Sequence, residues 1–183
     1  MPTEEELIEG CLNSDRKAQR ALYDLYAGKM LAISMRYSKS QQEAEDILQE
    51  AFIKVFDHLN NFRKESKLYS WIKRIVVNTA LNHQRSKLYL YPMVDVETVR
   101  IQDEKSFSLS HFHYEDLMKM IQNLPVGCKV IFNLYAVEGY KHNEIADMLN
   151  ISEGTSKSQY SRAKQLLKEM LVEQERGRYE RFR

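Results

Sequence analysis

The chain has 183 residues, and its 27 Lys and Arg against 26 Asp and Glu give a formal net charge of +1 at pH 7. This length accommodates one large domain or two small ones, each able to bury a core. Only 3 Pro and 6 Gly interrupt long stretches of apolar periodicity, so we expect an all-helical protein. Its two cysteines, Cys11 and Cys128, lie far apart in the sequence, which argues against a disulfide framework and against a clustered metal site.

Charge is sorted along the chain although it nearly cancels overall. Counting Lys and Arg against Asp and Glu gives a net −4 for residues 1–59, +6 for 60–91, −2 for 92–112, −2 for 113–150 and +3 for 151–183. Two basic segments separated by acidic ones indicate two surfaces that face polyanions. A chain that is basic only in places is expected to bind nucleic acid weakly on its own.

The N-terminal sequence indicates where the protein resides. The residues PTEEELIE are acidic and lack the basic and apolar regions of a secretory signal. No apolar run approaches the length that spans a membrane. We therefore expect a cytoplasmic protein with reduced thiols and no membrane segment of its own.

Three helices are expected before residue 60. Thr3 and Glu6 fit a capping box for a short first helix. A second helix is expected from Ser14, with apolar residues recurring every three or four positions: Ala18, Ala21, Leu22, Leu25, Tyr26, Met30, Ile33 and Tyr37. Ser40 and Glu43 fit a second capping box, which opens a third helix. Its predicted core face comprises Ala44, Ile47, Leu48, Ala51, Phe52, Val55, Phe56 and Leu59.

The opposite side of the third helix carries a polar cluster at spacings of three and four residues: Glu43, Asp46, Gln49 and Glu50. One interpretation is that acids in the first turns complement the helix dipole and stay solvated. The other is a docking face for a basic partner surface. The pattern by itself leaves both open.

Residues 60–67, NNFRKESK, break the periodicity and predict a loop, followed by a helix from Ser66 to about Tyr89. The buried side of this helix is expected to comprise Leu68, Ile72, Ile75, Val76 and Thr79. Its outward side mixes cations with amides, which can hold a nucleic-acid backbone and read bases: Lys73, Arg74, Asn78, Asn82, Arg85 and Lys87. Three aromatic residues offer faces on which an unpaired base can stack: Phe62, Tyr69 and Trp71. Alternatively, the tryptophan belongs to the core and the amides merely face solvent.

Residues 92–112, PMVDVETVRIQDEKSFSLSHF, lack sustained periodicity and are expected to form a flexible linker between domains at 1–91 and 113–172. The second domain is expected to begin with a helix from about Tyr114 to Asn123. Pro125 then starts a helix whose core residues are Val130, Ile131, Leu134 and Val137, with Cys128 a small buried residue. Residues 173–183 are expected to form a basic tail. Its last residues, ERGRYERFR, are expected to be frayed and solvated, with phosphate contact or partner binding as the alternative.

Residues 139–167, GYKHNEIADMLNISEGTSKSQYSRAKQLL, predict a helix-turn-helix. In the first helix the apolar spacing is that of Ile145, Ala146 and Leu149. Ile151 lies in the turn, and Ser152 is a natural N-cap for the second helix. That helix is expected to present Thr155, Lys157, Ser158, Ser161, Arg162 and Lys164, and to keep Tyr160, Ala163 and Leu167 inward. Hydroxyls and cations beside a helix N-terminus suit phosphates and base edges in a major groove, although a solvated amphipathic helix is the alternative.

Two segments together resemble bacterial sigma factors of the extracytoplasmic-function (ECF) type, the two-domain subunits that direct RNA polymerase to promoters. They are residues 46–83, DILQEAFIKVFDHLNNFRKESKLYSWIKRIVVNTALNH, and residues 138–167, EGYKHNEIADMLNISEGTSKSQYSRAKQLL. The resemblance extends from about Leu7 to Leu171 and rests on several segments in the right order. It implies a non-catalytic subunit that carries no cofactor.

The resemblance implies roles for particular positions. The segment that grips the clamp helices of the polymerase's largest subunit is matched by Asp46, Gln49 and Glu50. The loop that captures an unstacked base of the minus-ten element is matched by Phe62, Arg63 and Ser66. The helix after that loop is matched by Trp71, Arg74, Asn78 and Asn82. The helix that enters the major groove at the minus-thirty-five element is matched by Thr155, Lys157, Ser158, Ser161 and Arg162.

The implied partners are core RNA polymerase, through its clamp helices and its flap, and promoter DNA, together with an inhibitory anti-sigma factor. Three residues depart from the family pattern. Lys64 stands where Gly is frequent, so the base-capturing loop is expected to differ in shape. Lys141 replaces a capping Ser or Thr, and Ser156 replaces an apolar residue that would seat the recognition helix.

Two rival functions remain to be weighed. A conventional helix-turn-helix regulator would bind a palindromic duplex as a dimer without polymerase, whereas a sigma factor should be monomeric and bind free duplex poorly. A small hydrolase or metalloenzyme would use Cys128, His111 or His113. No plausible base or nucleophile elbow accompanies these residues, and the two histidines with Glu115 have no second ligand cluster. We therefore expect no catalytic residue and no metal site.

Overall fold

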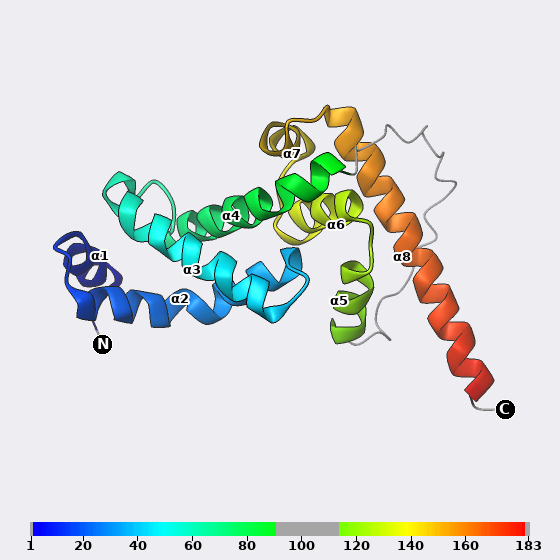
Figure 1. The fold of residues 1–183 in the computed structure, drawn as a ribbon, viewed down its shortest axis with the longest axis horizontal. Helices are drawn as coiled ribbons and strands as arrows, with labels where there is room; N and C mark the ends of the chain where they lie inside the picture. The colour runs from blue at the N-terminus through cyan, green and yellow to red at the C-terminus, as the bar shows by residue number, and fades with distance from the viewer. Residues whose placement is uncertain (1, 91–113, 182–183) are drawn as a thin grey trace. The chain divides into compact units, whose positions relative to one another are not determined.

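The computed structural model describes residues 2–90 and 114–181, and every regular element in these ranges is a helix (Figure 1). The chain separates into two compact units, residues 1–85 and 86–183, which are described one at a time. The predicted all-helical fold in two parts is confirmed. The predicted linker, residues 92–112, lies outside the described residues.

Unit 1 begins with α1, Glu4–Leu12, which has the predicted capping box at its N-terminus. The Thr3 hydroxyl oxygen accepts a hydrogen bond from the Glu6 N–H at 3.2 Å, and the Glu6 carboxylate accepts one from the Thr3 N–H at 2.7 Å. Two backbone donors that the helix leaves without intrahelical partners are thereby satisfied. A short N-terminal helix therefore begins where the sequence predicts.

The next two helices, α2 (Arg16–Tyr37) and α3 (Gln41–His58), lie side by side and run in opposite directions (Figure 1). α2 begins slightly later than predicted, because Ser14 adopts a left-handed conformation with φ of 60°. Asp15 caps α2 instead, and its carboxylate accepts the Lys17 N–H at 2.8 Å. The chain therefore turns sharply between α1 and α2.

A single 3-10 turn, Leu59–Asn61, and a loop lead to α4, Leu68–Leu90, which runs back along α3. α4 was predicted to start at Ser66. Its first helical hydrogen bonds instead go from the N–H groups of Ser70 and Trp71 to the Lys67 carbonyl. α4 therefore begins two residues later than predicted, directly after the predicted loop, residues 60–67.

The core of unit 1 lies where α2, α3 and α4 meet. Its fully buried apolar residues include Leu22, Met30, Tyr37, Ala44, Ile47, Ala51, Val55, Leu68, Ile72, Val76, Val77 and Ala80. Burial of a large aliphatic side chain contributes about 1.5–3 kcal/mol. The predicted periodicity was wrong for Leu25, which is 53% exposed, and it missed Val77. Phe56 and Ile75 are only half-buried.

Within the described residues 114–181, unit 2 contains five helical elements: α5 (Tyr114–Gln122), α6 (Val126–Phe132), the π-helical turn η3 (Asn133–Val137), α7 (His142–Leu149) and α8 (Glu153–Arg181). Pro125 occupies the N-cap of α6, as the sequence predicts. After η3 the chain turns at Gly139, whose φ of 82° suits a residue without a Cβ. α7 and α8 form the predicted helix-turn-helix.

The core of unit 2 includes Ile121, Cys128, Ile131, Leu134, Ile145, Ala163 and Leu167. Cys128 is 1% exposed, which confirms its prediction as a buried residue. Val137 was predicted to be core, but it is 40% exposed at the end of the π-helical turn. Tyr160 is half-buried rather than fully inward.

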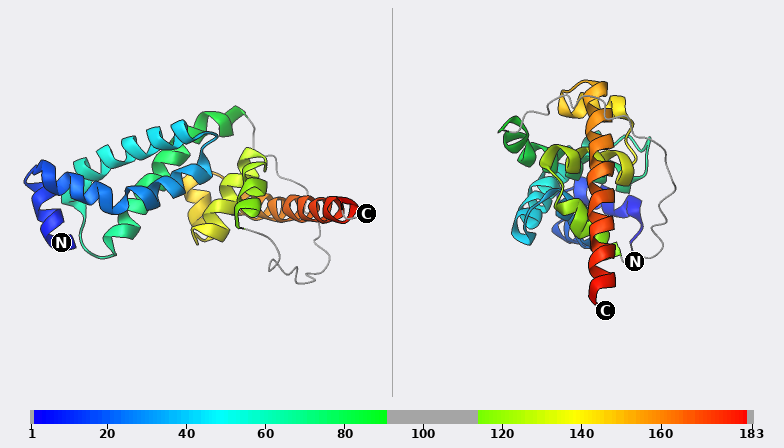
Figure 2. Two further views of the ribbon diagram at one scale, coloured as in Figure 1. Left: turned by 90° about the horizontal axis from the view of Figure 1, so that it is seen from below. Right: turned by 90° about the vertical axis from the view of Figure 1, so that its right-hand side faces the viewer.

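α8 continues well beyond the predicted helix-turn-helix, and both views in Figure 2 show it as one unbroken helix. It extends through most of the predicted tail, residues 173–183, and ends at Arg181. The frayed conformation predicted there is therefore wrong as far as that residue. Among the described helices, α8 included, none is both long enough and apolar enough to cross a membrane.

Candidate nucleic-acid interface

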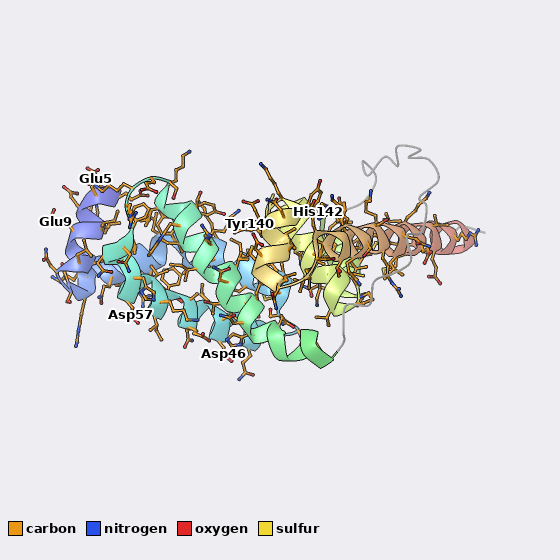
Figure 3. The ribbon with its side chains drawn as sticks, turned by 90° about the horizontal axis from the view of Figure 1, so that it is seen from above. Glu5, Glu9, Asp46, Asp57, Tyr140 and His142 are labelled. Atoms are coloured by element: carbon orange, nitrogen blue, oxygen red, sulfur yellow. The ribbon has the colours of Figure 1, made fainter. Side chains whose placement is uncertain are left out.

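The predicted docking face lies on α3, which starts at its Ser40 N-cap. Ser40 accepts the Glu43 N–H at 3.1 Å, and the Glu43 carboxylate accepts the Lys39 N–H at 2.7 Å, so Glu43 serves the helix terminus. Asp46 and Gln49 are exposed, as predicted. Figure 3 labels Asp46 at the outer edge of α3. The part of the polar cluster open to a partner therefore centres on Asp46 and Gln49.

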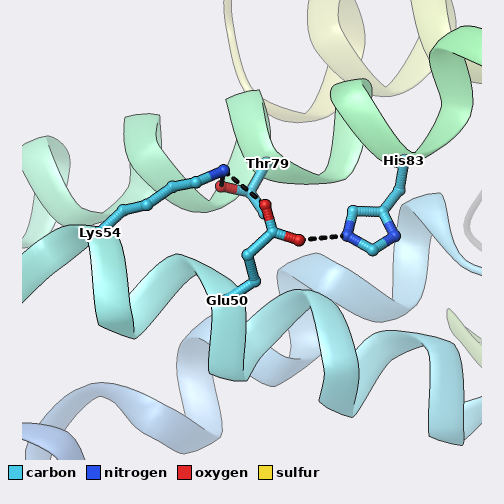
Figure 4. A network of polar contacts seen from close by, with 4 residues as sticks. All are labelled: Glu50, Lys54, Thr79 and His83. Carbon is cyan, nitrogen blue, oxygen red and sulfur yellow. Dashed lines mark hydrogen bonds and ion pairs between the residues drawn. The ribbon is translucent and has the colours of Figure 1, made fainter.

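Glu50, the third predicted docking residue, is held differently (Figure 4). One of its carboxylate oxygens lies 2.6 Å from Lys54 Nζ, and the other lies 2.6 Å from His83 Nε2 on α4. Lys54 Nζ also donates to Thr79 Oγ1 at 3.4 Å. Hydrogen bonds from Lys54 and then His83 hold the pKa of the Glu50 carboxyl below its usual range. Glu50 therefore links α3 to α4, a contact that the sequence analysis missed.

The predicted base-capturing loop brings two aromatic rings together. The ring centroids of Phe62 and Trp71 are 5.4 Å apart with an interplanar angle of 50°, and both residues are half-buried. Arg63 and Ser66 are exposed. The sequence left open whether Trp71 belongs to the core or offers a free face for a base. In the structure it is half-buried, so neither alternative holds in full. An aromatic pair beside an exposed cation is suited to stacking with a base.

Lys64 adopts a left-handed conformation with φ of 57°. This is the backbone region that Gly enters at little cost. Lys64 therefore adopts a backbone conformation that Gly would also favour, and the expected difference in loop shape stays a prediction. Lys64 Nζ also lies 3.1 Å from a carboxylate oxygen of Glu5, which connects the loop to α1.

Three predicted DNA-facing residues lie along one side of α4. Arg74, Asn78 and Asn82 are all exposed, and their four-residue spacing places them on consecutive turns. The opposite side, with Ile72, Val76 and Ala80 among its members, is fully buried. The structure therefore brings one cation and two amides into a single exposed stripe, while the side chain of Arg85 lies outside the described ones.

In the turn of the helix-turn-helix, one residue ends α7 and another caps the start of α8. Asn150 ends α7 in the left-handed conformation, with φ of 54°, which Asn tolerates better than most residues. Ser152 then caps α8: its hydroxyl oxygen accepts the Thr155 N–H at 2.9 Å, and its carbonyl accepts the Ser156 N–H at 3.1 Å. The predicted N-cap is confirmed.

The exposed side of the recognition helix is narrower than predicted. Lys157 and Arg162 are exposed, whereas Ser158 and Ser161 are half-buried. Thr155 is only 7% exposed, because its hydroxyl turns back to Ser152 Oγ at 2.8 Å. The prediction that Thr155 faces outward was therefore wrong, and the two cations are the prominent groups on this face.

The two family departures in this region are accommodated by side chains elsewhere. The Glu144 carboxylate accepts the Lys141 N–H at 2.7 Å and so supplies part of the cap that Lys141 cannot. Ser156 is fully buried, and its hydroxyl lies 2.9 Å from His142 Nδ1. A hydrogen bond between α7 and α8 therefore replaces the apolar contact expected at position 156, and the predicted loosening of the helix has a compensating contact.

An aromatic cluster surrounds this hydrogen bond, and the sequence analysis missed it. Tyr135 stacks on His142 with ring centroids 4.2 Å apart and an interplanar angle of 13°, and Tyr160 lies 4.6 Å from Tyr135. Lys164 Nζ lies 5.3 Å from the Tyr160 ring centroid. The cluster packs η3 and α7 against α8, the recognition helix.

Replacement of Ser152 by Ala is expected to destabilise unit 2 by about 1 kcal/mol, because the Thr155 N–H and the Thr155 hydroxyl both lose their contact with the Ser152 hydroxyl. Urea denaturation of the protein, followed by circular dichroism, measures the change. Ser152→Asp is the matched control, since its carboxylate can accept the same N–H. A Ser152→Asp loss as large as that of Ser152→Ala would contradict the capping role.

Replacement of His142 by Gln is expected to flatten the pH dependence of stability. Desolvation, reinforced by Lys157, lowers the pKa of His142 in the folded state below its ordinary value of 6.5. The unfolded chain therefore takes up a proton at higher pH than the folded chain. The stability that His142 contributes is present above about pH 6.5 and is lost as the pH falls through that value toward the lowered pKa. Urea midpoints at about pH 7.5 and about pH 5 measure the difference, and equal losses in both proteins would contradict it.

The hydrolase or metalloenzyme alternative depended on Cys128, His111 and His113. The Cys128 thiol is buried and lies 3.1 Å from Gln159 Oε1, and burial raises its pKa, which disfavours the nucleophilic thiolate. His111 and His113 lie outside the described residues. Within residues 2–90 and 114–181, no group of three His, Cys, Asp or Glu side chains is arranged to hold a metal ion.

Comparison with known proteins decides between the remaining alternatives. Residues 22–88 match Sigma-70 region 2, and residues 114–167 match Sigma-70, region 4. The RNA polymerase sigma-H factor of Pseudomonas aeruginosa is 30% identical over 183 residues, covering 92% of this chain and 93% of that protein. This chain belongs to the sigma-70 family. It is a sigma factor of the ECF type, a promoter-specificity subunit that acts with RNA polymerase in transcription initiation.

Further comparisons agree with this sigma factor in sequence and in fold. The ECF RNA polymerase sigma-E factor of Escherichia coli strain K12 is 29% identical over 177 residues, covering 90% of this chain and 92% of that protein. A solved structure of the sigma factor RpoE with the anti-sigma factor NepR from Bartonella quintana matches with a TM-score of 0.54 at 24% identity, covering 84% and 96% of the two chains. CnrH in complex with the cytosolic domain of CnrY matches with a TM-score of 0.51 at 16% identity, covering 91% and 95%. These two structures share the fold.

Proposed function

We propose that this sigma factor divides its work between the two units. Unit 1 docks on the clamp helices of the largest polymerase subunit through Asp46 and Gln49 on α3. The minus-ten element is captured by Phe62, Arg63, Ser66, Trp71, Arg74, Asn78 and Asn82. Unit 2 binds the polymerase flap and reads the minus-thirty-five element through Lys157, Ser158, Ser161 and Arg162. It is a cytoplasmic protein without catalysis of its own.

The observation that carries this proposal is the exposed stripe of Arg74, Asn78 and Asn82 on α4, next to the aromatic pair. Opening a duplex removes base stacking, at a cost of a few kcal/mol for each extruded base. Aromatic faces and amide groups supply replacement stacking and hydrogen bonds. The arrangement therefore supports capture of an unpaired base rather than recognition of an intact duplex.

The recognition helix supports the second half of the proposal. Lys157 and Arg162 present cations on a helix that follows a tight turn, which suits entry into a major groove. Each contact is weak alone. When polymerase holds both units on one DNA, the second contact forms at a high effective concentration, so two weak contacts act together. This accounts for a specific DNA-binding protein with a formal net charge of only +1.

An anti-sigma factor is the proposed inhibitor. The Bartonella quintana structure is described as a sigma factor bound to an anti-sigma factor, and it shares the fold of this chain. A protein that masks both DNA-binding units would keep this sigma factor inactive until a signal releases it. If pulldowns under many growth conditions recover polymerase and never an inhibitor, this part of the proposal fails.

Run-off transcription tests the proposal as a whole. Core RNA polymerase is incubated with a fragmented genomic template, with and without this protein. We expect discrete new transcripts, whose upstream sequences reveal the minus-ten and minus-thirty-five elements. If no transcript appears and gel filtration detects no complex with core polymerase, a free-standing helix-turn-helix regulator becomes the better account.

A further inference from the structure

The contact between Glu50 and His83 joins the two working faces of unit 1 (Figure 4). Glu50 directly follows Gln49 of the docking face in the sequence. On α4, His83 directly follows Asn82, and Thr79 directly follows Asn78. Glu50, Thr79 and His83 are therefore each the immediate sequence neighbour of a residue that we assign to polymerase or to DNA.

We propose that Glu50 is a positioning residue, which fixes the rotation of α4 about its axis relative to α3 and so aims Asn78 and Asn82 at the minus-ten element. This inference rests on the proposed function of α3 and α4. It assigns to Glu50 a role inside the domain rather than a direct contact with polymerase.

The geometry of the carboxylate carries the argument. Both oxygens are engaged at 2.6 Å, one by Lys54 on the same helix and one by His83 across the helix pair. The link between Lys54 Nζ and Thr79 Oγ1 at 3.4 Å repeats the crossing one turn away. Two polar links one turn apart restrain rotation and sliding together, whereas a single link would restrain only one point.

The apolar part of the same interface is less able to set this rotation. Fully buried residues on the two helices include Ala44, Ala51, Val55, Val76 and Ala80. Apolar burial is strong but non-directional, whereas a hydrogen bond weakens steeply when its angle departs from linearity. The apolar core thus holds α4 against its neighbours, and the charge-assisted contacts to Glu50 select one orientation.

The electrostatic surroundings favour the same assignment. Lys54 and His83 already occupy one acceptor site on each oxygen of the carboxylate, so a donor from a partner would have to share the carboxylate with them. Asp46 and Gln49 are exposed residues. Glu50, taken as a whole residue, is half-buried, and 43% of its side chain is exposed. Of the three predicted docking residues, Glu50 is therefore the least exposed and the one whose carboxylate is already bound to α4.

The test compares two measurements on the assembled holoenzyme: the dissociation constant for core polymerase, and the extent of open-complex formation at saturating holoenzyme. For Glu50→Gln we expect a dissociation constant within about twofold of the wild type and open-complex formation reduced about tenfold, the scale of one lost charge-assisted hydrogen bond. His83→Leu should behave in the same way. The double variant should open promoters no less than either single variant, because both substitutions remove the same contact between Glu50 and His83.

Two further variants separate positioning from general stability. His83→Gln keeps an amide donor toward Glu50 and should retain most open-complex formation, even if His83→Leu lowers the thermal midpoint. Glu45→Gln makes the same chemical change as Glu50→Gln on the same helix, outside the contact, and should leave both measurements unchanged.

Two results would overturn the inference. One is a Glu50→Gln variant that loses core affinity, as we expect for Asp46→Ala on the docking face, while His83→Leu opens promoters normally, since Glu50 would then contact polymerase directly. The other is normal open-complex formation by all of the Glu50 and His83 variants. Failure of the wild-type holoenzyme to open any promoter would instead contradict the proposed function itself.

Discussion

Replacing Asn78 and Asn82 together by Ala is expected to lower open-complex formation about 100-fold, if each amide contributes about 1–3 kcal/mol to a base contact. Both residues are exposed on α4, and Ala is the better helix former. The fold of unit 1 should therefore stay intact, and the dissociation constant for core polymerase should stay within about twofold of the wild type. Permanganate reactivity of unpaired thymines in the promoter measures the opening directly.

Asn123→Ala is a matched control for this variant. Asn123 is an exposed residue at the end of α5, in unit 2, and outside the proposed DNA-facing stripe. It should open promoters as the wild type does. Unchanged opening by Asn78→Ala/Asn82→Ala would show that the stripe does not hold the minus-ten element, and a matching loss of polymerase binding would point to a folding defect instead.

Sequence periodicity predicted the buried face of a helix well where neighbouring helices cover that face completely. On α3, six predicted core residues are buried, because the apolar stripe lies between two packed helices. Leu25 on α2 is the instructive exception: it has the right spacing, yet it is 53% exposed. Spacing along one helix states which residues share a face, but it cannot state how far a neighbouring helix covers that face.

The contacts that the sequence analysis missed join residues far apart in the chain. Glu50 and His83 are separated by 33 positions, and each is polar at a place where a solvated residue is the ordinary expectation. His142 and Ser156 are closer, but their contact exists only because the turn folds α7 onto α8. Such pairs have no periodic signal, so only the packing of the helices identifies them.

Thr155 was wrongly predicted to face outward because of a contact with a residue close to it in the sequence. A hydroxyl at the first turn of a helix can bond to the capping side chain before it, and the Thr155 hydroxyl does so at 2.8 Å. Its position in the family pattern had suggested an outward role. This side chain therefore leaves the DNA-facing set, which increases the weight placed on Lys157 and Arg162.

The recognition helix is therefore expected to depend strongly on one exposed cation. Arg162→Ala should reduce initiation at promoters with an intact minus-thirty-five element by about 10-fold to about 100-fold, because a good bidentate contact from Arg to a base edge discriminates by about 1–3 kcal/mol. Lys157 is less available, since its Nζ lies 2.7 Å from a carboxylate oxygen of Glu153. The measurement is run-off transcription on paired templates, one intact and one with the upstream element scrambled.

The paired templates separate DNA reading from stability. If Arg162 reads the upstream element, Arg162→Ala should lose activity on the intact template and little on the scrambled one, with core polymerase affinity unchanged. Lys168→Ala, at an exposed cation further along α8, removes the same charge and should spare both templates. Equal loss on intact and scrambled templates would mean that the substitution damages unit 2, because a residue that reads a sequence has no effect where that sequence is absent.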